Sequence, residues 1–147
     1  MPEIRPLTSS EVELVVGVLG LARLYQGNGI YVVAWRDGEP LGHAYVALTD
    51  PPELQDVEVR AEQRRRGVAR ALTEYARDEA RRRGFDRLRV EVSVENAPAQ
   101  ALYRPCGFVS SGERPRRVTG TVELRTGPVN VDDTFLVWEK CLGDDAR

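Results

Sequence analysis

The sequence predicts one α/β (α+β) domain that occupies residues 1–147, and three observations support this fold class. Strand-like runs rich in β-branched and aromatic residues alternate along the chain with amphipathic helical segments. No internal repeat and no linker interrupts this order. The length of 147 residues, with 41% hydrophobic and 30% charged residues, suits one globular domain whose core needs no disulfide or metal.

The N-terminal segment predicts a short strand followed by a helix. Residues 4–7 are strand-like, and Ser9 or Ser10 is the expected N-cap of a helix over 10–24. The apolar residues of this segment recur at helical spacing. Gly27-Asn28-Gly29 then breaks the helix, because glycine and asparagine favour turns.

A β-hairpin and a further strand are expected next. Strand-like residues 31–35 and 41–48 flank a turn at 36–40 that contains an Asp-Gly pair and a proline. The following strand, 53–59, shifts its apolar alternation by one residue along its length. Such a shift predicts a β-bulge, which we place near residues 55–57.

The second half of the chain contains the most regular helical pattern. Apolar residues follow i, i+3, i+4, i+7 and i+8 spacing from Val68, so we expect a helix over 67–84 that ends at Gly84. Asn96 is the expected N-cap of a short helix over 97–103. Strands are expected at 88–94, 108–110 and 135–141, whereas residues 111–133 give no clear signal.

The bulk properties exclude several classes of function. A net charge of −2 argues against a nucleic-acid-binding protein, which would usually be basic. The N-terminus does not resemble a signal peptide and no apolar run reaches the roughly 18 residues of a membrane span, so a cytoplasmic protein without membrane contact is expected. With only Cys106, Cys141 and His43 available, neither a disulfide framework nor a metal site is expected.

The strongest chemical signal is the run Arg64-Arg65-Arg66-Gly67-Val68-Ala69, between the strand at 53–59 and the helix at 67–84. The first turn of a helix carries unpaired N–H groups and the positive end of the dipole, which together attract phosphate. Gly67 lets an anion approach the backbone. Arginines at a helix start are unfavourable without an anion, so the run predicts anion binding rather than a solvated basic helix start. It is neither a Walker A nor a Rossmann motif.

Three motifs resemble those of the GNAT superfamily of N-acetyltransferases. Arg64-x-x-Gly67-x-Ala69 matches the superfamily's pyrophosphate loop, Gln/Arg-x-x-Gly-x-Gly/Ala. Glu53-Leu54-x-Asp56-Val57-x-Val59 is similar to the preceding strand. A third motif falls at the family spacing with Asn96, Ala99, Leu102, Tyr103, Gly107 and Phe108. The chain departs from the family at Pro105 and Cys106, and in a short region before the hairpin where one family helix is expected to be lost.

The resemblance implies a mixed, mostly antiparallel central sheet of six to seven strands, splayed in the middle and flanked by helices. It also implies acetyl-CoA (coenzyme A) as the acyl donor, with no metal. The pantetheine arm would lie between the strands at 53–59 and 88–94, with its pyrophosphate on the loop amides. The implied cofactor-binding residues are Val57, Glu58, Val59, Arg64, Arg65, Arg66, Gly67, Val68, Ala69, Arg70, Asn96 and Tyr103.

The resemblance also suggests how acyl transfer would proceed. The backbone N–H of Val57 would stabilise the oxyanion, and Tyr103 would protonate or hydrogen-bond the leaving sulfur unless it is only a packing residue. Glu53 fits the family position of the general base and would act through water. Asp56 and Glu58 are rivals on the same strand, and a reaction without a dedicated base is the other alternative. For each carboxylate, simple solvent exposure is the competing interpretation.

Other polar residues are interpreted as structural. His43 is expected to be a hydrogen-bonded histidine within a strand, and Cys106 a small buried residue beside a turn. The arginines at 81–83 suit a solvated helix C-terminus. Those at 114, 116, 117 and 125 are expected to line an exposed hairpin, although they could instead meet an acidic acceptor.

The sequence therefore predicts an acetyl-CoA-dependent N-acetyltransferase that moves an acetyl group directly, through a ternary complex, to a primary amine. The acceptor is left open between a small molecule and a peptide or protein N-terminus or side chain. A non-catalytic coenzyme A-binding module of the same fold is the main alternative, and another anion-binding α/β domain, such as a nucleotide binder, is the third. Pairing of the final strands would allow a homodimer.

Overall fold

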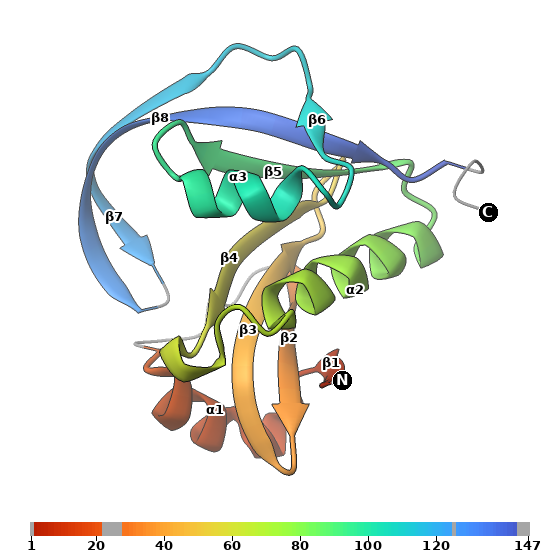
Figure 1. Ribbon diagram of the computed structural model, residues 1–147, viewed down its shortest axis with the longest axis vertical. Coiled ribbons are helices and arrows are strands. Elements are labelled where there is room, and N and C mark those ends of the chain that lie inside the picture. Colours follow the sequence, from red (N-terminus) through yellow and green to blue (C-terminus); the bar gives the residue numbers. More distant parts are fainter. Residues whose placement is uncertain (1, 22–27, 125, 144–147) are drawn as a thin grey trace.

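The computed structural model describes residues 2–21, 28–124 and 126–143. Within them, helices and strands alternate around one twisted sheet (Figure 1). The elements in chain order are β1 (Glu3–Pro6), the 3₁₀ turn η1 (Ser9–Glu11), α1 (Val12–Leu19), β2 (Gly29–Arg36), β3 (Glu39–Ala47), β4 (Glu53–Val59), the 3₁₀ turn η2 (Ala61–Gln63), α2 (Val68–Arg82), β5 (Arg87–Ser93), α3 (Ala97–Tyr103), β6 (Val109–Ser110), β7 (Arg116–Leu124) and β8 (Gly127–Cys141).

The sheet has the strand order β1-β2-β3-β4-β5-β8-β6, with β7 paired to β8. Every pair is antiparallel except β4 and β5, which are parallel. These two strands pair only at Glu53 with Arg89 and Leu54 with Val90, and then diverge. The predicted mixed, mostly antiparallel, splayed sheet is thus confirmed. It has eight strands because residues 111–133 contain β7 and the first half of β8.

Two apolar clusters hold helices against opposite faces of the sheet. The buried face of α2, which includes Val68 and Leu72, packs against Leu54 and Val90 in the main core. On the other face, Val15 of α1 packs against Val33 in a second cluster. Helix α2 begins directly after the loop at the end of β4, so its core contacts fix the position of that loop.

The predicted β-bulge lies in β4 and is confirmed. His43 pairs with Glu58 and Tyr45 with Gln55, so two residues, Asp56 and Val57, face the single residue between them on β3. Asp56 has a φ of 52°, in the left-handed region. The extra residue of the bulge shifts the side-chain alternation by one position. As a result, Leu54, Val57 and Val59 all contact the α2 side of the sheet. Glu58 therefore points to the opposite face.

The helix predicted over 10–24 differs at both ends. The segment begins with the 3₁₀ turn η1, whose N-cap is Thr8 rather than Ser9 or Ser10, and the Thr8 N–H donates to the Glu11 carboxylate at 3.2 Å; α1 itself begins at Val12. Helix α1 ends at Leu19 because Gly20 adopts a left-handed φ of 68° and its N–H donates to the Val16 carbonyl. The rest of the predicted helix, 22–24, and the place of any second helix at 22–27 lie outside the described residues.

The other local predictions are close to the observed elements. Helices α2 and α3 match the ranges expected from sequence within two residues, and Asn96 caps α3 by accepting the Ala99 N–H at 3.1 Å. The final strand, β8, begins at Gly127, eight residues earlier than expected. In the described part of the chain, no helix is long and apolar enough to cross a membrane.

Candidate active site

The loop before α2 brings the predicted phosphate-binding residues together. Gly67 is the N-cap of α2 and has a φ of 84°, which glycine adopts without strain. A Cβ atom built at this position meets no atom within 4 Å, so the loop is open on this side. Arg64, Arg65 and Arg66 precede it with exposed side chains. The arginine cluster therefore surrounds an accessible helix N-terminus.

The backbone N–H groups of this loop point to a ligand. Within the described residues, none of the six N–H groups from Arg65 to Arg70 donates to a protein acceptor. The first helical bond comes only from the Ala71 N–H to the Gly67 carbonyl, at 3.0 Å. Unpaired amides at the positive end of a helix dipole favour a bound anion. Four of these groups, from Gly67 to Arg70, are unpaired at any helix start, and those of Arg65 and Arg66 extend the row into the loop.

The edge of β4 that diverges from β5 leads into this loop. Beyond Leu54 no described strand pairs with the β5-facing side of β4, so the edge has no strand partner along Val57 to Val59. The strand then runs through η2 directly into the phosphate loop. An extended ligand could pair with the strand while its anionic end binds the loop.

Tyr103 lies at the end of α3, where it is only 8% exposed. Its ring meets the Phe108 ring edge-on, with centroids 5.5 Å apart. Burial raises the pKa of Tyr103 to about 12, with smaller increases from the negative charges of Cys106 and Asp56. The phenol is therefore protonated at neutral pH and lies near enough to the bulge to sense Asp56.

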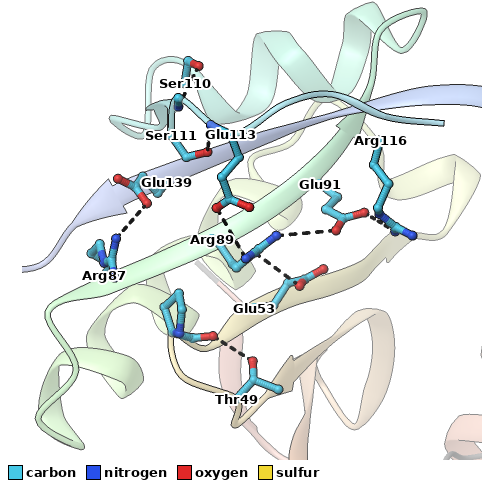
Figure 2. A network of polar contacts seen from close by, with 12 residues as sticks. Thr49, Glu53, Arg87, Arg89, Glu91, Ser110, Ser111, Glu113, Arg116 and Glu139 are labelled. Atoms are coloured by element: carbon cyan, nitrogen blue, oxygen red, sulfur yellow. Dashed lines mark hydrogen bonds and ion pairs between the residues drawn. The ribbon is translucent and has the colours of Figure 1, made fainter.

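Glu53 belongs to a group of ion-paired side chains on β4, β5 and the segment before and within β7. Figure 2 shows this group, which we name the Glu53 network: Glu53, Arg89, Glu91, Glu113 and Arg116. Arg89 lies 3.5 Å from Glu53 and 3.6 Å from both Glu91 and Glu113, and Arg116 lies 2.5 Å from Glu91. Burial raises the pKa of Glu53, the charge of Glu91 adds to this, and Arg89 opposes it.

The three carboxylates that the sequence left as rivals therefore occupy different environments. Glu53 lies in its network and is only 21% exposed, so it is not a simple solvent-exposed strand residue. Asp56 forms the bulge near Tyr103. Glu58 is exposed on the opposite face. Glu91 was missed by the sequence analysis, although the alternation of Arg89 and Glu91 with buried neighbours is visible in the strand.

A pocket of about 410 Å³ lies on the α1 side of the sheet, and we name it the α1 pocket. His43 lines it and is 2% exposed. Because His43 and Glu58 are register partners, the pocket includes adjacent positions on β3 and β4. Its lining residues are Val18, Leu19, His43, Glu58, Val59, Arg60, Ala61, Glu62, Arg64 and Thr126.

Comparison with known proteins identifies the family. The sequence profile of the Acetyltransferase (GNAT) family matches residues 8–108, which is more than half of the chain. The chain belongs to the GNAT family.

Individual relatives of this GNAT protein agree with that assignment. A streptothricin acetyltransferase from Streptomyces lavendulae is 38% identical over 85 residues, which cover 56% of this chain and 45% of that relative. The match therefore spans less than half of that relative's length. The crystal structure of the ribosomal-protein-S18-alanine N-acetyltransferase from Escherichia coli has a TM-score of 0.73 at 21% identity, covering 99% of this chain and 98% of that one.

A Bacillus anthracis protein, solved in complex with acetyl coenzyme A, has a TM-score of 0.75 to this GNAT protein. The two share 17% identity, and the match covers 97% of this chain and 99% of that one. At this identity the likeness establishes the fold. It confirms the splayed sheet that the sequence resemblance implied.

The remaining polar residues of this GNAT protein lie outside the splayed strands. Cys106 is half-buried, and burial raises the pKa of its thiol, which disfavours the nucleophilic thiolate. The expected exposed hairpin is formed by β7 and β8, where Arg117 pairs with Asp132 and Arg116 joins the Glu53 network. Arg125 lies outside the described residues.

Proposed function

We propose that this GNAT protein transfers an acetyl group from acetyl-CoA directly to a primary amine. The observation that carries the proposal is the row of six unpaired amides at the start of α2, beside the open edge of β4. The named relatives, which are acetyltransferases, and the related fold solved with acetyl coenzyme A support it. The acceptor is either a small molecule or the amine of a peptide or protein.

The residues present fit the cofactor in two places. The amides from Arg65 to Arg70 would hold the pyrophosphate, and the backbone of Val57 and Val59 would pair with the pantetheine arm. Bound acetyl-CoA would supply a thioester, whose carbonyl carbon is the site of attack. Asn96 supports this arrangement indirectly, because its side chain caps the helix that ends at Tyr103.

Three groups of the chain would then act on the reacting atoms. The Val57 N–H would hydrogen-bond the carbonyl oxygen as negative charge develops there. Glu53 would take the amine proton through water, and its raised pKa brings its proton affinity closer to neutral pH. The amine nitrogen would first bond to the carbonyl carbon, giving a tetrahedral oxyanion, and the C–S bond would break as the carbonyl forms again. Tyr103, with a pKa of about 12, would stabilise the departing thiolate by donating a hydrogen bond rather than its whole proton.

Binding of acetyl-CoA tests the loop directly. At 100 times its Kd, acetyl-CoA should raise the free energy of unfolding by about 2.7 kcal/mol, seen as a higher Tm. Gly67→Glu should abolish this shift by placing a negative side chain at the phosphate site. Gly112→Glu is a matched control, because Gly112 has a similar φ of 86° and equally open surroundings. An unchanged shift in Gly67→Glu would refute the loop assignment.

Turnover tests the activity itself. Wild-type protein incubated with acetyl-CoA and a panel of primary amines should release free thiol in proportion to acetylated amine. Binding of acetyl-CoA without thiol release from any amine would instead identify a non-catalytic coenzyme A-binding module.

A further inference from the structure

The Glu53 network spans the point where β4 and β5 part. Glu53 and Arg89 form one of the two register pairs between these strands, and Glu91 lies two residues further along β5, where β4 has already diverged. Alternate strand residues point to the same face, so all three side chains lie opposite α2. Arg89 lies 3.5 Å from Glu53 and 3.6 Å from Glu91 (Figure 2). The proposed base therefore shares a guanidinium group with a second carboxylate.

The network contains more carboxylates than guanidinium groups. The carboxylates belong to Glu53, Glu91 and Glu113, and the guanidinium groups to Arg89 and Arg116. Arg89 lies between 3.5 and 3.6 Å from each of the three carboxylates, so it forms a close pair with none of them. Its buried Nε has no hydrogen-bond partner within the residues that the structure describes. How strongly Arg89 pairs with Glu53 therefore depends on what else neutralises Glu91.

Arg116 neutralises Glu91 and forms the shortest contact of the network. Its Nη2 donates to the Glu91 carboxylate at 2.5 Å. Arg116 begins β7 and is the register partner of Phe135 on β8, so the β7–β8 hairpin sets its position. The Glu91 side chain is 17% exposed, so water screens this pair only in part. While Arg116 holds Glu91, Arg89 is left to Glu53.

The neighbouring strands add no further unpaired charge on this face. From β3, Tyr45 is buried and uncharged at neutral pH. From β8, Glu139 lies opposite Arg89 but pairs with Arg87 at 3.4 Å. The charge that acts on Glu53 therefore comes mainly from within the network.

The directions of the pKa effects on Glu53 agree with this geometry. Burial raises the pKa of Glu53, the charge of Glu91 raises it further, and Arg89 and Arg116 lower it. Loss of Arg116 would remove one positive charge and would also leave Glu91 without its closest partner. Both changes favour the protonated form of Glu53, which cannot accept a proton from an amine.

From these observations we infer that Arg116 is a positioning residue for the proposed base, because it holds Glu91 and so leaves Arg89 to Glu53. The β7–β8 hairpin thus supports proton transfer without contacting the reacting atoms. This inference rests on the proposed acetyltransferase activity and adds to it a residue outside the phosphate loop.

A carboxyl titration tests the coupling without any acceptor. Protein labelled with carbon-13 in its glutamate side chains is titrated with acid and followed by NMR, and the Glu53 signal is assigned by its loss in Glu53→Gln. In Arg116→Gln the midpoint of this signal should rise by at least about 0.5 pH unit, which is about a threefold change in proton affinity. Arg116→Lys keeps the positive charge and should remain closer to wild type.

Arg117→Gln is the matched control. Arg117 is the next residue of β7, lies on the opposite face of the strand and pairs with Asp132. Its side chain is 58% exposed and that of Arg116 is 59% exposed, so the two variants remove the same charge from equally accessible positions. The Glu53 midpoint should stay at its wild-type value in Arg117→Gln.

A double-mutant cycle tests whether Arg116 acts through Glu91. Glu91→Gln alone should lower the Glu53 midpoint, because it removes a negative charge that raises the pKa of Glu53. Adding Arg116→Gln to Glu91→Gln should then produce less than about half of the shift that it produces in wild type, since the loss of Glu91 leaves only its direct effect on Glu53. An equal shift in both backgrounds would overturn the part assigned to Glu91.

The pH dependence of turnover tests the effect on the reaction. The kcat/KM is measured against pH with the amine of the panel that releases thiol fastest. In Arg116→Gln the acid limb of the profile should move to higher pH, with a loss of at least about threefold there and less than about twofold at pH 8. The Tm shift with acetyl-CoA should be unchanged, because Arg116 lies outside the phosphate loop.

The outcomes separate the two proposals. An unchanged Glu53 midpoint in Arg116→Gln, or an equal rise in Arg117→Gln, would overturn the positioning role while leaving the acetyltransferase activity intact. No thiol release from wild-type protein with any amine would overturn the activity, and with it the role of Arg116 in the reaction, even if the titration shows the coupling.

Discussion

Tyr103 is packed in the core and lies close to the bulge of β4, where acyl transfer is proposed. Its ring is buried against Phe108, while its hydroxyl responds to the charge of Asp56 at the bulge. Because the pKa of Tyr103 is about 12, its hydroxyl is a neutral hydrogen-bond donor throughout the physiological pH range. One side chain can therefore both position α3 and act on a leaving group.

Tyr103→Phe separates these two roles. Phenylalanine keeps the ring contact with Phe108, so the Tm and the KM for acetyl-CoA should change little. The kcat should fall about 100-fold, because the departing thiolate loses its donor. Steady-state kinetics measure both quantities. Equal turnover in the variant would remove Tyr103 from the mechanism.

At the scale of elements, α3 shows how a short helix is fixed in place. It has seven residues, too few for stability in isolation, so its ends must be held. Asn96 caps its start, and the Gln100 side-chain amide donates to the carbonyls of Ser93 and Val94 at 3.1 Å each. These bonds attach α3 to the end of β5, beside the gap between the splayed strands.

Asn96→Ala removes the cap and leaves the Ala99 N–H without its acceptor. The free energy of unfolding should fall by about 1 kcal/mol, which for a chain of this length lowers the Tm by about 4 °C. Thermal unfolding followed by circular dichroism measures the change. Asn96→Asp retains an acceptor oxygen and should remain close to wild type; equal losses in both variants would show that the cap does not contribute.

Local signals explain which elements could be predicted from the sequence. Helix α2, the cap of α3 and the bulge in β4 each depend on neighbouring residues, and all three match the structure. The strands β7 and the first half of β8 were not assigned, although an exposed hairpin was expected there, because their largely exposed residues show no clear apolar alternation. The helix at 10–24 was extended too far because Leu21 continues the apolar pattern after Gly20 has already ended α1.

The candidate site, too, could be predicted from the sequence only where its residues form local patterns. The arginine loop is contiguous in sequence and Tyr103 belongs to a spaced motif, so both could be proposed as site residues from the sequence. The Glu53 network and the α1 pocket depend on β4 meeting β5, α1 and the β7–β8 hairpin, which no local pattern encodes. Only the folded arrangement places Glu53 and Glu58 in separate environments.

Two carboxylates, Glu11 and Glu53, change the stability of the folded protein in opposite directions as the pH changes. Glu11 accepts hydrogen bonds from the Arg5 guanidinium and the Thr8 N–H, which lower the pKa of Glu11 to about 2 from its usual value of 4.5. The folded state therefore binds fewer protons than the unfolded state between these values, and stability is lost as the pH falls from 4.5 toward 2. Burial raises the pKa of Glu53, so its contribution decreases as the pH rises above 4.5.

Glu11→Gln should lower stability at pH 7 and flatten the acid loss between pH 4.5 and 2, because glutamine does not titrate. Urea unfolding midpoints at pH 7 and pH 3 measure this, with Glu13→Gln as the reference variant. If the difference between the two midpoints is as large in Glu11→Gln as in wild type, the pairing of Glu11 with Arg5 is not a source of acid sensitivity.

The unpaired edge of β4 has a consequence for the behaviour of the free protein in a crowded solution. A sheet edge is a template on which a foreign polypeptide can add as a strand, and this is a common route to aggregation. Here the part of β4 that has no second strand partner is short, it is bent at Asp56, and β5 borders its start. A foreign strand needs a straight stretch of backbone to pair with, and this edge offers little of it. A slender amide-containing ligand needs only a few backbone N–H and C=O groups. The irregularity that leaves this edge open for the proposed acetyl-CoA therefore also makes it a poor template for self-association.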